Sequence, residues 1–249
     1  MPSAKEPVDR SARDRDELPV AWREAGPPGG ELVVLLHGLG GSRTAWEPQL
    51  ASLAAAGYLA AAWDMPGYGS SAPPHEWTFD ALAGAAATWI SGFGSGAAHV
   101  VGLSMGGSIA AETLARFPDL PCRALVMISS PADVSTLKPR PLSRDAMRQL
   151  RLRHALRMPR IAIRHLRGSK PRAAEAVSKL RMPKLIVTAE SDWLVDPSHG
   201  RVLAETAAPP VDYVHLDLPG SLHADALVKY VPLRLLRVLD RWLDRHAPP

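Results

Sequence analysis

The strongest constraint on the fold is a repeated alternation of strand-like and helix-like segments. Apolar runs typical of strands cover residues 18–22, 31–38, 59–64, 98–104, 124–131, 183–192 and 211–220. Helix-like segments separate most of them, and an amphipathic helix is expected over residues 230–246. Strands that alternate with helices form a parallel sheet with helices on both faces. The sequence therefore predicts an α/β fold with a mostly parallel, doubly wound sheet.

One serine follows a predicted strand in a glycine-rich turn. Ser104 lies in the pattern Gly102-Leu103-Ser104-Met105-Gly106, with a helix-like run directly after it. A nucleophile on so sharp a turn takes strained backbone angles, and the two glycines remove side chains that would collide there. The N-terminus of the following helix favours negative charge nearby. The pattern predicts Ser104 as a nucleophile, and a purely structural turn is the alternative.

A base and an acid follow the serine in the order expected of an acyl-transfer triad. Asp192 comes after the strand expected at 183–192, and His223 comes after the last one. A neutral imidazole takes the proton of the serine hydroxyl, and a carboxylate fixes the imidazole tautomer. Asp196 and Asp133 are the competing candidates for the acid, because each also follows a predicted strand.

A second glycine-rich loop follows the strand expected at 31–38. Its sequence is His37-Gly38-Leu39-Gly40-Gly41, and its glycines allow the main chain to approach a bound substrate closely. The backbone N–H groups of Leu39 and Met105 are predicted to form an oxyanion hole. We expect His37 to take part in the hydrogen bonding of the loop and not in proton transfer.

Five motifs together carry a resemblance to a known family. They are HGLGG (37–41), WDMPGYGSS (63–71), GLSMGG (102–107), TAESDWLVDP (188–197) and GSLH (220–223). As a set, they resemble the α/β-hydrolase superfamily over residues 18–246, and specifically its capped esterase, lipase and lactonase branch. The resemblance implies the α/β-hydrolase fold, a Ser104–His223–Asp192 triad and an oxyanion hole at Leu39 and Met105. It also implies that Asp64 holds a turn and is not catalytic.

The sequence departs from the family pattern at two positions. Ala189 and Leu222 stand where family members often carry glycine. Relatives that open epoxides or remove halides use an aspartate nucleophile, and Ser104 makes this chain unlike them.

The charge distribution marks a separate segment. Residues 133–182 hold 14 Lys and Arg against three Asp and Glu, whereas the whole chain carries a net charge of only +4. We expect a basic helical cap over 133–182, with a helix from Ser143 to Arg157 and a second helix in which Ala173, Val177 and Leu180 share a face. The core is expected over 18–132 and 183–249, and residues 1–17 are expected to form a mobile tail.

The basic cap admits several partners. The arginines could simply be exposed to solvent, or they could attract an acidic substrate. They could also bind an acidic acyl carrier or a coenzyme thioester, or lie against an anionic membrane surface. Nucleic acid is disfavoured because the segment lacks aromatic residues that would stack on bases. Trp46 and Trp193, which follow the oxyanion loop and the acid, are candidates for lining a substrate pocket, with ordinary packing as the alternative.

The composition argues against a membrane span, a disulfide and a metal site. The sequence contains no apolar stretch long enough to span a membrane and no apolar leader near its charged N-terminus. The single Cys122 excludes an internal disulfide, suits a cytoplasmic location and is expected to be a small buried residue near the start of a strand. The histidines lack metal-ligand spacing, so neither a metal nor a cofactor is expected.

Three functions therefore compete. The first is a serine hydrolase that cleaves a carboxylic ester, with a thioester or lactone as variants, through an acyl-enzyme. The second keeps the triad but hydrolyses a C–C bond next to a ketone, or performs haloperoxidase-like perhydrolysis. The third is a catalytically silent binding protein, because fold alone does not determine function.

Overall fold

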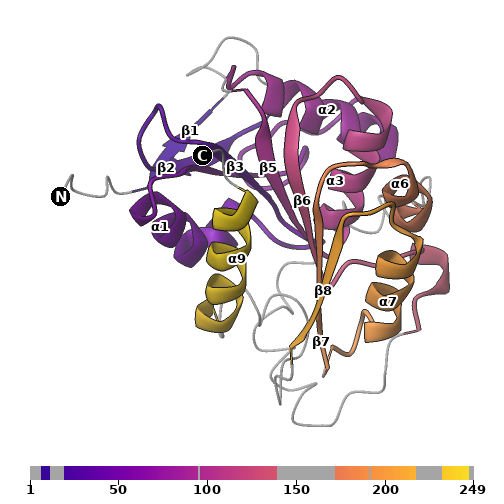
Figure 1. The fold of residues 1–249 in the computed structure, drawn as a ribbon. Helices are drawn as coiled ribbons and strands as arrows, with labels where there is room; N and C mark the ends of the chain where they lie inside the picture. The colour runs from indigo at the N-terminus through magenta and orange to yellow at the C-terminus, as the bar shows by residue number, and fades with distance from the viewer. Residues whose placement is uncertain are drawn as a thin grey trace, which may run out of the picture.

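The computed structural model describes residues 7–11, 20–94, 96–138, 172–190, 192–216 and 232–246. Its strands, in chain order, are β1 (Val8–Arg10), β2 (Trp22–Ala25), β3 (Leu32–Leu36), β4 (Leu59–Trp63), β5 (Ala98–Leu103), β6 (Cys122–Ile128), β7 (Lys184–Ala189) and β8 (Val211–Leu216). They form one sheet in the order β1-β2-β4-β3-β5-β6-β7-β8 (Figure 1). The β1–β2 and β2–β4 pairs are antiparallel, and the other pairs are parallel. The predicted fold class is confirmed.

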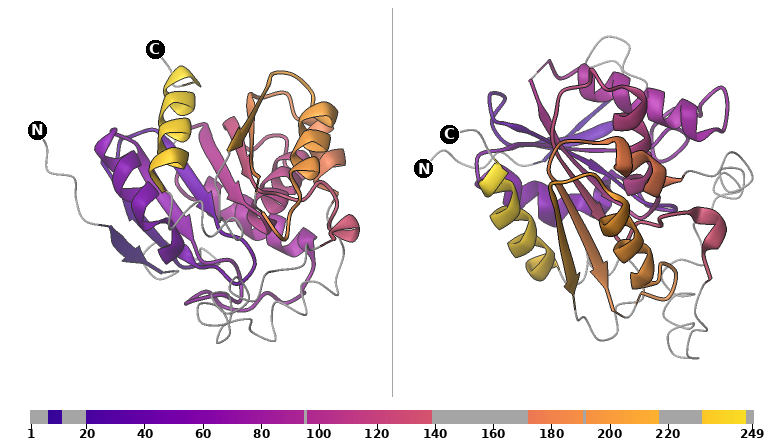
Figure 2. Two further views of the ribbon diagram at one scale, coloured as in Figure 1. Left: turned by 90° about the horizontal axis from the view of Figure 1, so that it is seen from below. Right: turned by 45° about the vertical axis from the view of Figure 1, so that its right-hand side comes forward.

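Helices cover both faces of the sheet (Figures 1 and 2). The described helices are α1 (Glu47–Ala55), α2 (Phe79–Ser91), α3 (Met105–Arg116), α6 (Ala173–Lys179), α7 (Pro197–Thr206) and α9 (Pro232–His246), with short 3-10 helices η1 (Arg43–Trp46) and η2 (Val134–Thr136). The helices α2, α3, α6 and α7 contribute to the core on one face, and α1 and α9 contribute to the core on the other. This two-sided cover explains why the strands β3, β4, β5 and β7 are buried along their whole length.

The parallel strands set the position of the candidate site. Their carboxyl ends lie at one edge of the sheet, so the residues that follow β3, β5, β6 and β7 are neighbours there. Residues 37, 104, 129 and 190 are the first residues after these four strands. The glycine-rich loop, Ser104 and the candidate acids are therefore collected from distant parts of the sequence.

The N-terminal segment contains a strand that the sequence analysis missed. The expectation of a mobile tail is wrong for Val8–Arg10, because these residues form β1 and pair with β2. Charged side chains explain the pairing: Arg10 Nε lies 3.0 Å from Glu24 Oε1, and Arg23 Nε lies 2.7 Å from Asp9 Oδ1. The first predicted strand is also displaced, since β2 begins only at Trp22.

The expected cap boundary at residue 182 falls inside the core. Helix α6 begins at Ala173, and Ala173 and Val177 are fully buried in the same core cluster as Ile109 of α3. The Ala174 N–H donates to the carbonyl of Ala132, which joins α6 to the segment that follows β6. The helix is therefore as predicted, but it belongs to the core. The helix predicted from residue 143 to residue 157 lies outside the described residues.

Helix α7 was not predicted, although its start has a recognisable signal. Asp196 accepts a hydrogen bond from Ser198 N–H at 2.9 Å, and Pro197 occupies the first helical position. Cys122 is the first residue of β6, as expected, but it is half-buried and not fully buried; desolvation raises the pKa of its thiol to about 12. In the described part of the chain, no helix combines the length and apolar content required to cross a membrane.

Candidate active site

Ser104 occupies a strained turn between β5 and α3. Its backbone angles are φ 54° and ψ −121°, a region that residues other than glycine rarely adopt. The Ser104 N–H donates to the carbonyl of Ile128 on β6 at 2.8 Å, and the Ser104 carbonyl accepts from Gly107 N–H at 3.0 Å. These bonds hold the turn from both sides and place the serine at the N-terminus of α3. The predicted strand–turn–helix context of Ser104 is confirmed.

The glycines on either side of Ser104 are required by close backbone contacts. A Cβ atom on Gly102 would lie 2.4 Å from the Cα of Gly107, and one on Gly106 would lie 2.2 Å from the carbonyl oxygen of Leu36. Either contact is too short for real atoms, so a side chain at residue 102 would push α3 away, and one at residue 106 would push the turn away from β3. The glycines therefore permit the close approach that the sequence pattern predicts.

The loop after β3 lies directly against Ser104. A Cβ atom built on Gly38 would lie 3.0 Å from the Cβ of Ser104 and 3.6 Å from its Oγ. Leu39 follows Gly38, and Met105 follows Ser104, so the two expected oxyanion donors flank this contact in the sequence. The site residues expected from the sequence thus include a serine and a glycine-rich loop that the fold brings together.

His37 uses both ring nitrogens to hold this loop. Met65 N–H donates to His37 Nε2 at 3.0 Å, which leaves the proton on Nδ1, and Nδ1 donates to the carbonyl of Gly38 at 2.7 Å. The ring is fully buried and lies edge-on to Tyr68 with 5.2 Å between ring centroids. The predicted structural role of His37 is confirmed, because a ring engaged in this way cannot transfer a proton to Ser104.

Asp192 is a buried carboxylate just beyond the end of β7. Its side chain accepts hydrogen bonds from Leu194 N–H at 3.0 Å and Val195 N–H at 2.9 Å, and the residue is only 1% exposed. The two competing candidates for the acid, Asp133 and Asp196, each form the N-cap of a helix. Asp133 accepts from Ser135 N–H and begins η2, and Asp196 begins α7. Burial therefore favours Asp192 as the acid. His223, the predicted base, lies outside the described residues.

Comparison with known proteins decides the family. The family model described as "alpha/beta hydrolase fold" matches residues 31–176, which is more than half of the chain. The chain belongs to the α/β-hydrolase fold family.

Three similar proteins illustrate the range of the family. Over 120 residues, 47% of this chain and 31% of the other, it is 41% identical to a dihydrolipoyllysine-residue acetyltransferase component of an acetoin cleaving system from Cupriavidus necator. It is 36% identical to epoxide hydrolase B from Mycobacterium tuberculosis over 41% of this chain and 29% of that protein. The chain thus spans about a third of the length of these two relatives.

The third similar protein is known from its structure. A thermophilic esterase from Thermogutta terrifontis superposes with a TM-score of 0.72, covering 98% of this chain and 100% of the other. The two sequences are only 19% identical, so this likeness shows the α/β-hydrolase fold alone.

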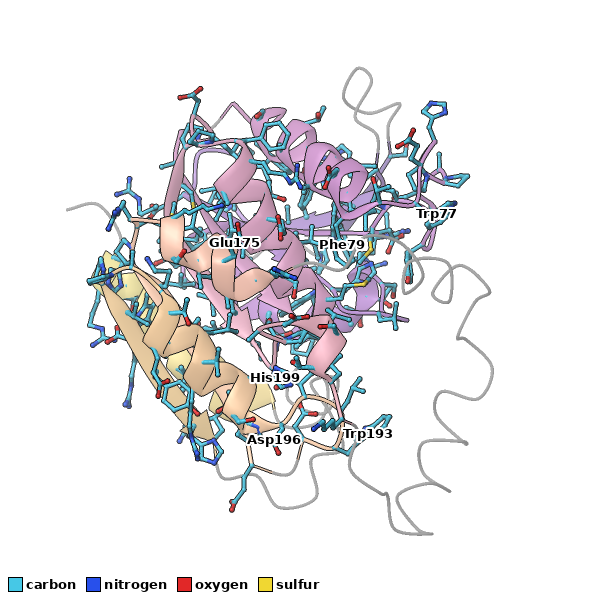
Figure 3. All side chains as sticks on the ribbon, turned by 90° about the vertical axis from the view of Figure 1, so that its right-hand side faces the viewer. Trp77, Phe79, Glu175, Trp193, Asp196 and His199 are labelled. Atoms are coloured by element: carbon cyan, nitrogen blue, oxygen red, sulfur yellow. The ribbon has the colours of Figure 1, made fainter. Side chains whose placement is uncertain are left out.

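The two tryptophans proposed to line a pocket have different environments. Trp46 is fully buried in the core beneath α1 and α9, together with Leu50 and Leu53. These contacts fit the alternative of ordinary packing for Trp46, and its role in lining a substrate pocket stays a prediction. Trp193 is half-buried beside Asp192, and Figure 3 shows it at the same end of the molecule as Asp196 and His199. Its role as a pocket residue stays a prediction.

Two further residues at this edge were missed in the sequence. Ser129, the first residue after β6, has φ 44° and is 1% exposed, and its N–H donates to Val187 O at 2.8 Å. His199 on α7 accepts from Ala132 N–H at 3.3 Å through Nδ1. Burial lowers the pKa of His199, and the negative charge of Asp196 offsets only part of this shift. A polar residue directly after an apolar strand was the available signal for Ser129, and none existed for His199 without α7.

The described residues offer little to a metal ion. Across ranges 7–11, 20–94, 96–138, 172–190, 192–216 and 232–246, no group of three or more His, Cys, Asp or Glu side chains is arranged to hold one.

Proposed function

We propose that this α/β-hydrolase is a serine hydrolase that cleaves a carboxylic ester, including a thioester or lactone, through an acyl-enzyme. The observation that carries the proposal is the strained Ser104, with φ 54° at the start of α3 and the Gly38 loop against its side chain. Backbone strain of about 1–3 kcal/mol persists where the surrounding structure holds it and is concentrated at functional sites. A structural turn has no need of a hydroxyl at this position.

The proposed mechanism assigns one step to each group. His223 takes the proton as Ser104 Oγ attacks the carbonyl carbon, and the N–H groups of Leu39 and Met105 bind the oxyanion that forms. His223 then gives the proton to the leaving alcohol or thiol. Water attacks the acyl-enzyme with His223 again as the base, which releases the acid and restores Ser104. Asp192 keeps the imidazole in the required tautomer and stabilises its charged form.

The similar proteins do not all support ester cleavage to the same degree. The epoxide hydrolase relative shares the fold, but the aspartate nucleophile expected for epoxide opening is replaced here by Ser104. The esterase with a TM-score of 0.72 supports a small acyl ester as the first substrate class to test. Trp193, half-buried next to Asp192, is the described side chain that we propose for contact with the acyl or alcohol group.

Labelling with a fluorophosphonate tests the proposal directly. The probe should label the wild-type chain at one site and should not label Ser104→Ala, because the phosphorus atom reacts with an activated serine. Hydrolysis of a series of acyl esters of increasing length should fall by on the order of 10⁶ in Ser104→Ala. Ser108→Ala is the matched control, since Ser108 is a buried serine on the same helix whose hydroxyl bonds the carbonyl of Pro131 at 3.5 Å.

Each outcome of this test has one meaning. A wild-type chain that does not label, or a Ser104→Ala variant that keeps a tenth of the activity, would contradict the nucleophile assignment. A chain that labels at Ser104 but hydrolyses none of the esters would favour C–C bond hydrolysis or perhydrolysis. Retained folding in Ser104→Ala, measured by circular dichroism, excludes unfolding as the cause of a lost activity.

A further inference from the structure

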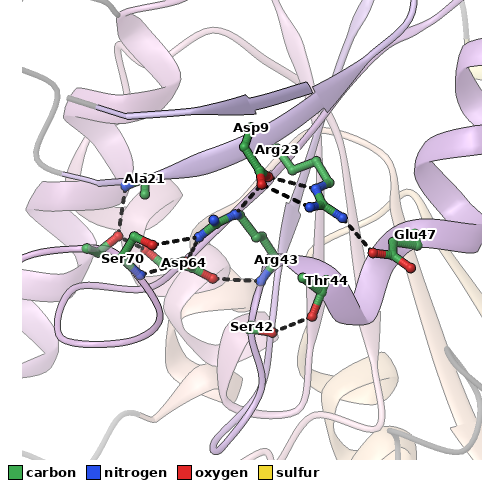
Figure 4. A network of polar contacts seen from close by, with 10 residues as sticks. Asp9, Ala21, Arg23, Ser42, Arg43, Thr44, Glu47, Asp64 and Ser70 are labelled. Carbon is green, nitrogen blue, oxygen red and sulfur yellow. Dashed lines mark hydrogen bonds and ion pairs between the residues drawn. The ribbon is translucent and has the colours of Figure 1, made fainter. Parts of the chain in front are cut away.

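A chain of alternating charges connects the N-terminal strand to the glycine-rich loop beside Ser104. In order, it consists of Glu47, Arg23, Asp9, Arg43 and Asp64, which lie in five different segments of the sequence (Figure 4). The distances are 2.5 Å from Arg23 Nη1 to Glu47 Oε1, 2.7 Å from Arg23 Nε to Asp9 Oδ1 and 3.1 Å from Arg43 Nε to Asp9 Oδ1. Each cation therefore lies between two carboxylates.

Arg43 is the point where this chain meets the loop. Its side chain forms an ion pair with Asp64 Oδ2, and its backbone N–H donates to Asp64 Oδ1 at 2.8 Å. The Asp64 side chain is 1% exposed and that of Arg43 is 15% exposed. Asp64 also accepts from Ser70 N–H at 3.1 Å. An ion pair screened so little by water is strong only while both partners keep their geometry.

The loop itself is short and is tied down along its length. Residues 37–43 run from the end of β3 to the start of η1. Near its start, His37 accepts from Met65 N–H, and in its middle, the Gly40 backbone is hydrogen-bonded to Tyr68. Arg43 and Asp64 close the other end. All three sets of contacts are made with residues 64–70, so the loop 64–70 holds the loop 37–43 in place.

The Asp64 side chain is packed tightly against the backbone of the loop 64–70. A Cβ atom on Gly69, where φ is 50°, would lie 1.9 Å from Asp64 Oδ2. The Asp64 carboxylate therefore lies directly against the Gly69 backbone, where any side chain at residue 69 would displace it. Asp9 on β1 then fixes the other side of the Arg43 guanidinium. The hydrogen bond from Arg23 holds the pKa of Asp9 well below its usual range, so Asp9 stays charged at neutral pH.

We propose that Arg43 is a positioning residue for the oxyanion hole, and that Asp9 of the N-terminal strand acts through Arg43. This inference rests on the proposed function, because it concerns the Leu39 N–H as an oxyanion donor. Gly38 contacts Ser104, so a shift of the 37–43 loop changes the distance between that donor and the reacting carbonyl. A misplacement of about 1 Å costs on the order of 10²-fold in rate.

The expected effects follow from what each substitution removes. Arg43→Gln removes both ion pairs and should lower kcat by roughly 10–100-fold, with KM changed much less, since an oxyanion donor acts mainly in the transition state. Arg43→Lys keeps a charge at Asp64 but cannot bridge two carboxylates, so it should recover part of kcat. Asp9→Asn should lower kcat by only about 2–5-fold, because the Asp9 side chain is 48% exposed and the pair is screened.

The test separates positioning from simple stabilisation by counting active sites. The sites that react with a fluorophosphonate are titrated in each variant, and kcat for a short acyl ester is expressed per titrated site. Arg10→Gln is the matched control. It breaks an ion pair of the same strand, between Arg10 Nε and Glu24 Oε1 at 3.0 Å, that does not include Arg43. It should leave kcat per site within about twofold of wild type.

Several results would overturn the inference. If Arg43→Gln loses titratable sites and melting temperature but keeps its kcat per site, then Arg43 only stabilises the fold. If Arg43→Gln does not fold, Asp9→Asn decides: an unchanged kcat per site contradicts the proposal. A wild-type chain that fails to label at Ser104 refutes the proposed function and the inference together, whereas normal labelling with unchanged variants refutes the inference alone.

Discussion

The pH dependence of stability should reveal a buried histidine at the end of the sheet opposite Ser104. His99 on β5 is fully buried, and its Nε2 lies 3.1 Å from Glu31 Oε1. Burial lowers the pKa of His99 from 6.5 to about 4, and the positive charges of Arg123 and His246 add to the effect. The folded protein therefore keeps His99 neutral under conditions in which the unfolded chain protonates it.

The size of the effect follows from linkage. The folded pKa is below the unfolded value, so the stabilisation is complete above pH 6.5 and is lost as pH falls toward about 4. At 1.36 kcal/mol for each unit of pKa, the loss approaches about 3 kcal/mol. Burial also raises the pKa of Glu31, and proton uptake by folded Glu31 opposes part of this loss near the acidic end. We expect a net decline of about 2–3 kcal/mol.

Urea unfolding at several pH values measures this decline. In His99→Gln, most of the decline between pH 6.5 and about 4 should disappear, although the lowered pKa of His199 leaves a smaller dependence of the same sign. His75→Gln is the control, because His75 is exposed and its loss should not change the slope. Equal slopes in wild type and His99→Gln would refute the reasoning, since the buried imidazole would then titrate as it does in the unfolded chain.

Two other predictions concern the acid and a buried lysine. Asp192→Asn should lower kcat by roughly 10⁴, because the imidazole would take the wrong tautomer, whereas Asp133→Asn should change kcat little. If steady-state kinetics show a severe loss in Asp133→Asn alone, the acid is the aspartate after β6. Burial lowers the pKa of Lys184 to about 8, so Lys184 by itself should add stability between about pH 8 and 10.5, whereas the raised pKa of Cys122 removes stability above about pH 9. In urea unfolding, stability should therefore rise less, or fall more, with pH in Lys184→Met than in wild type, and an unchanged slope would contradict the lowered pKa of Lys184.

Periodicity and glycine patterns carried most of the fold prediction. A run such as Leu32–Leu36, apolar at every position, fits a strand covered on both faces, and the covered strand is β3. The glycines around Ser104 were equally informative, because the contacts that a Cβ atom would make are too short for any other residue. Local patterns of this kind are readable because the physical cause lies within a few residues of the signal.

Interactions between segments that are distant in the sequence could not be predicted from local patterns. The strand Val8–Arg10 has the composition of a solvated tail, and only the positions of Arg23, Glu24 and Arg43 in the fold make it a strand. Trp46 likewise follows the glycine-rich loop in sequence, yet the turn into η1 directs its ring into the core. The position of a residue next to this loop in the sequence therefore does not report whether its side chain packs in the core.

The three candidate acids show which physical quantity the sequence does not report. Asp133, Asp192 and Asp196 each accept a hydrogen bond from a backbone N–H two residues later, so all three satisfy the same local turn rule. Asp133 and Asp196 do so while partly exposed, which shows that the turn does not require burial. Asp192 is 1% exposed, and burying a carboxylate costs free energy that the turn alone does not explain. The burial of Asp192 is therefore the observation that favours it as the acid, and it depends on how β7 and the loop after it pack in the folded chain.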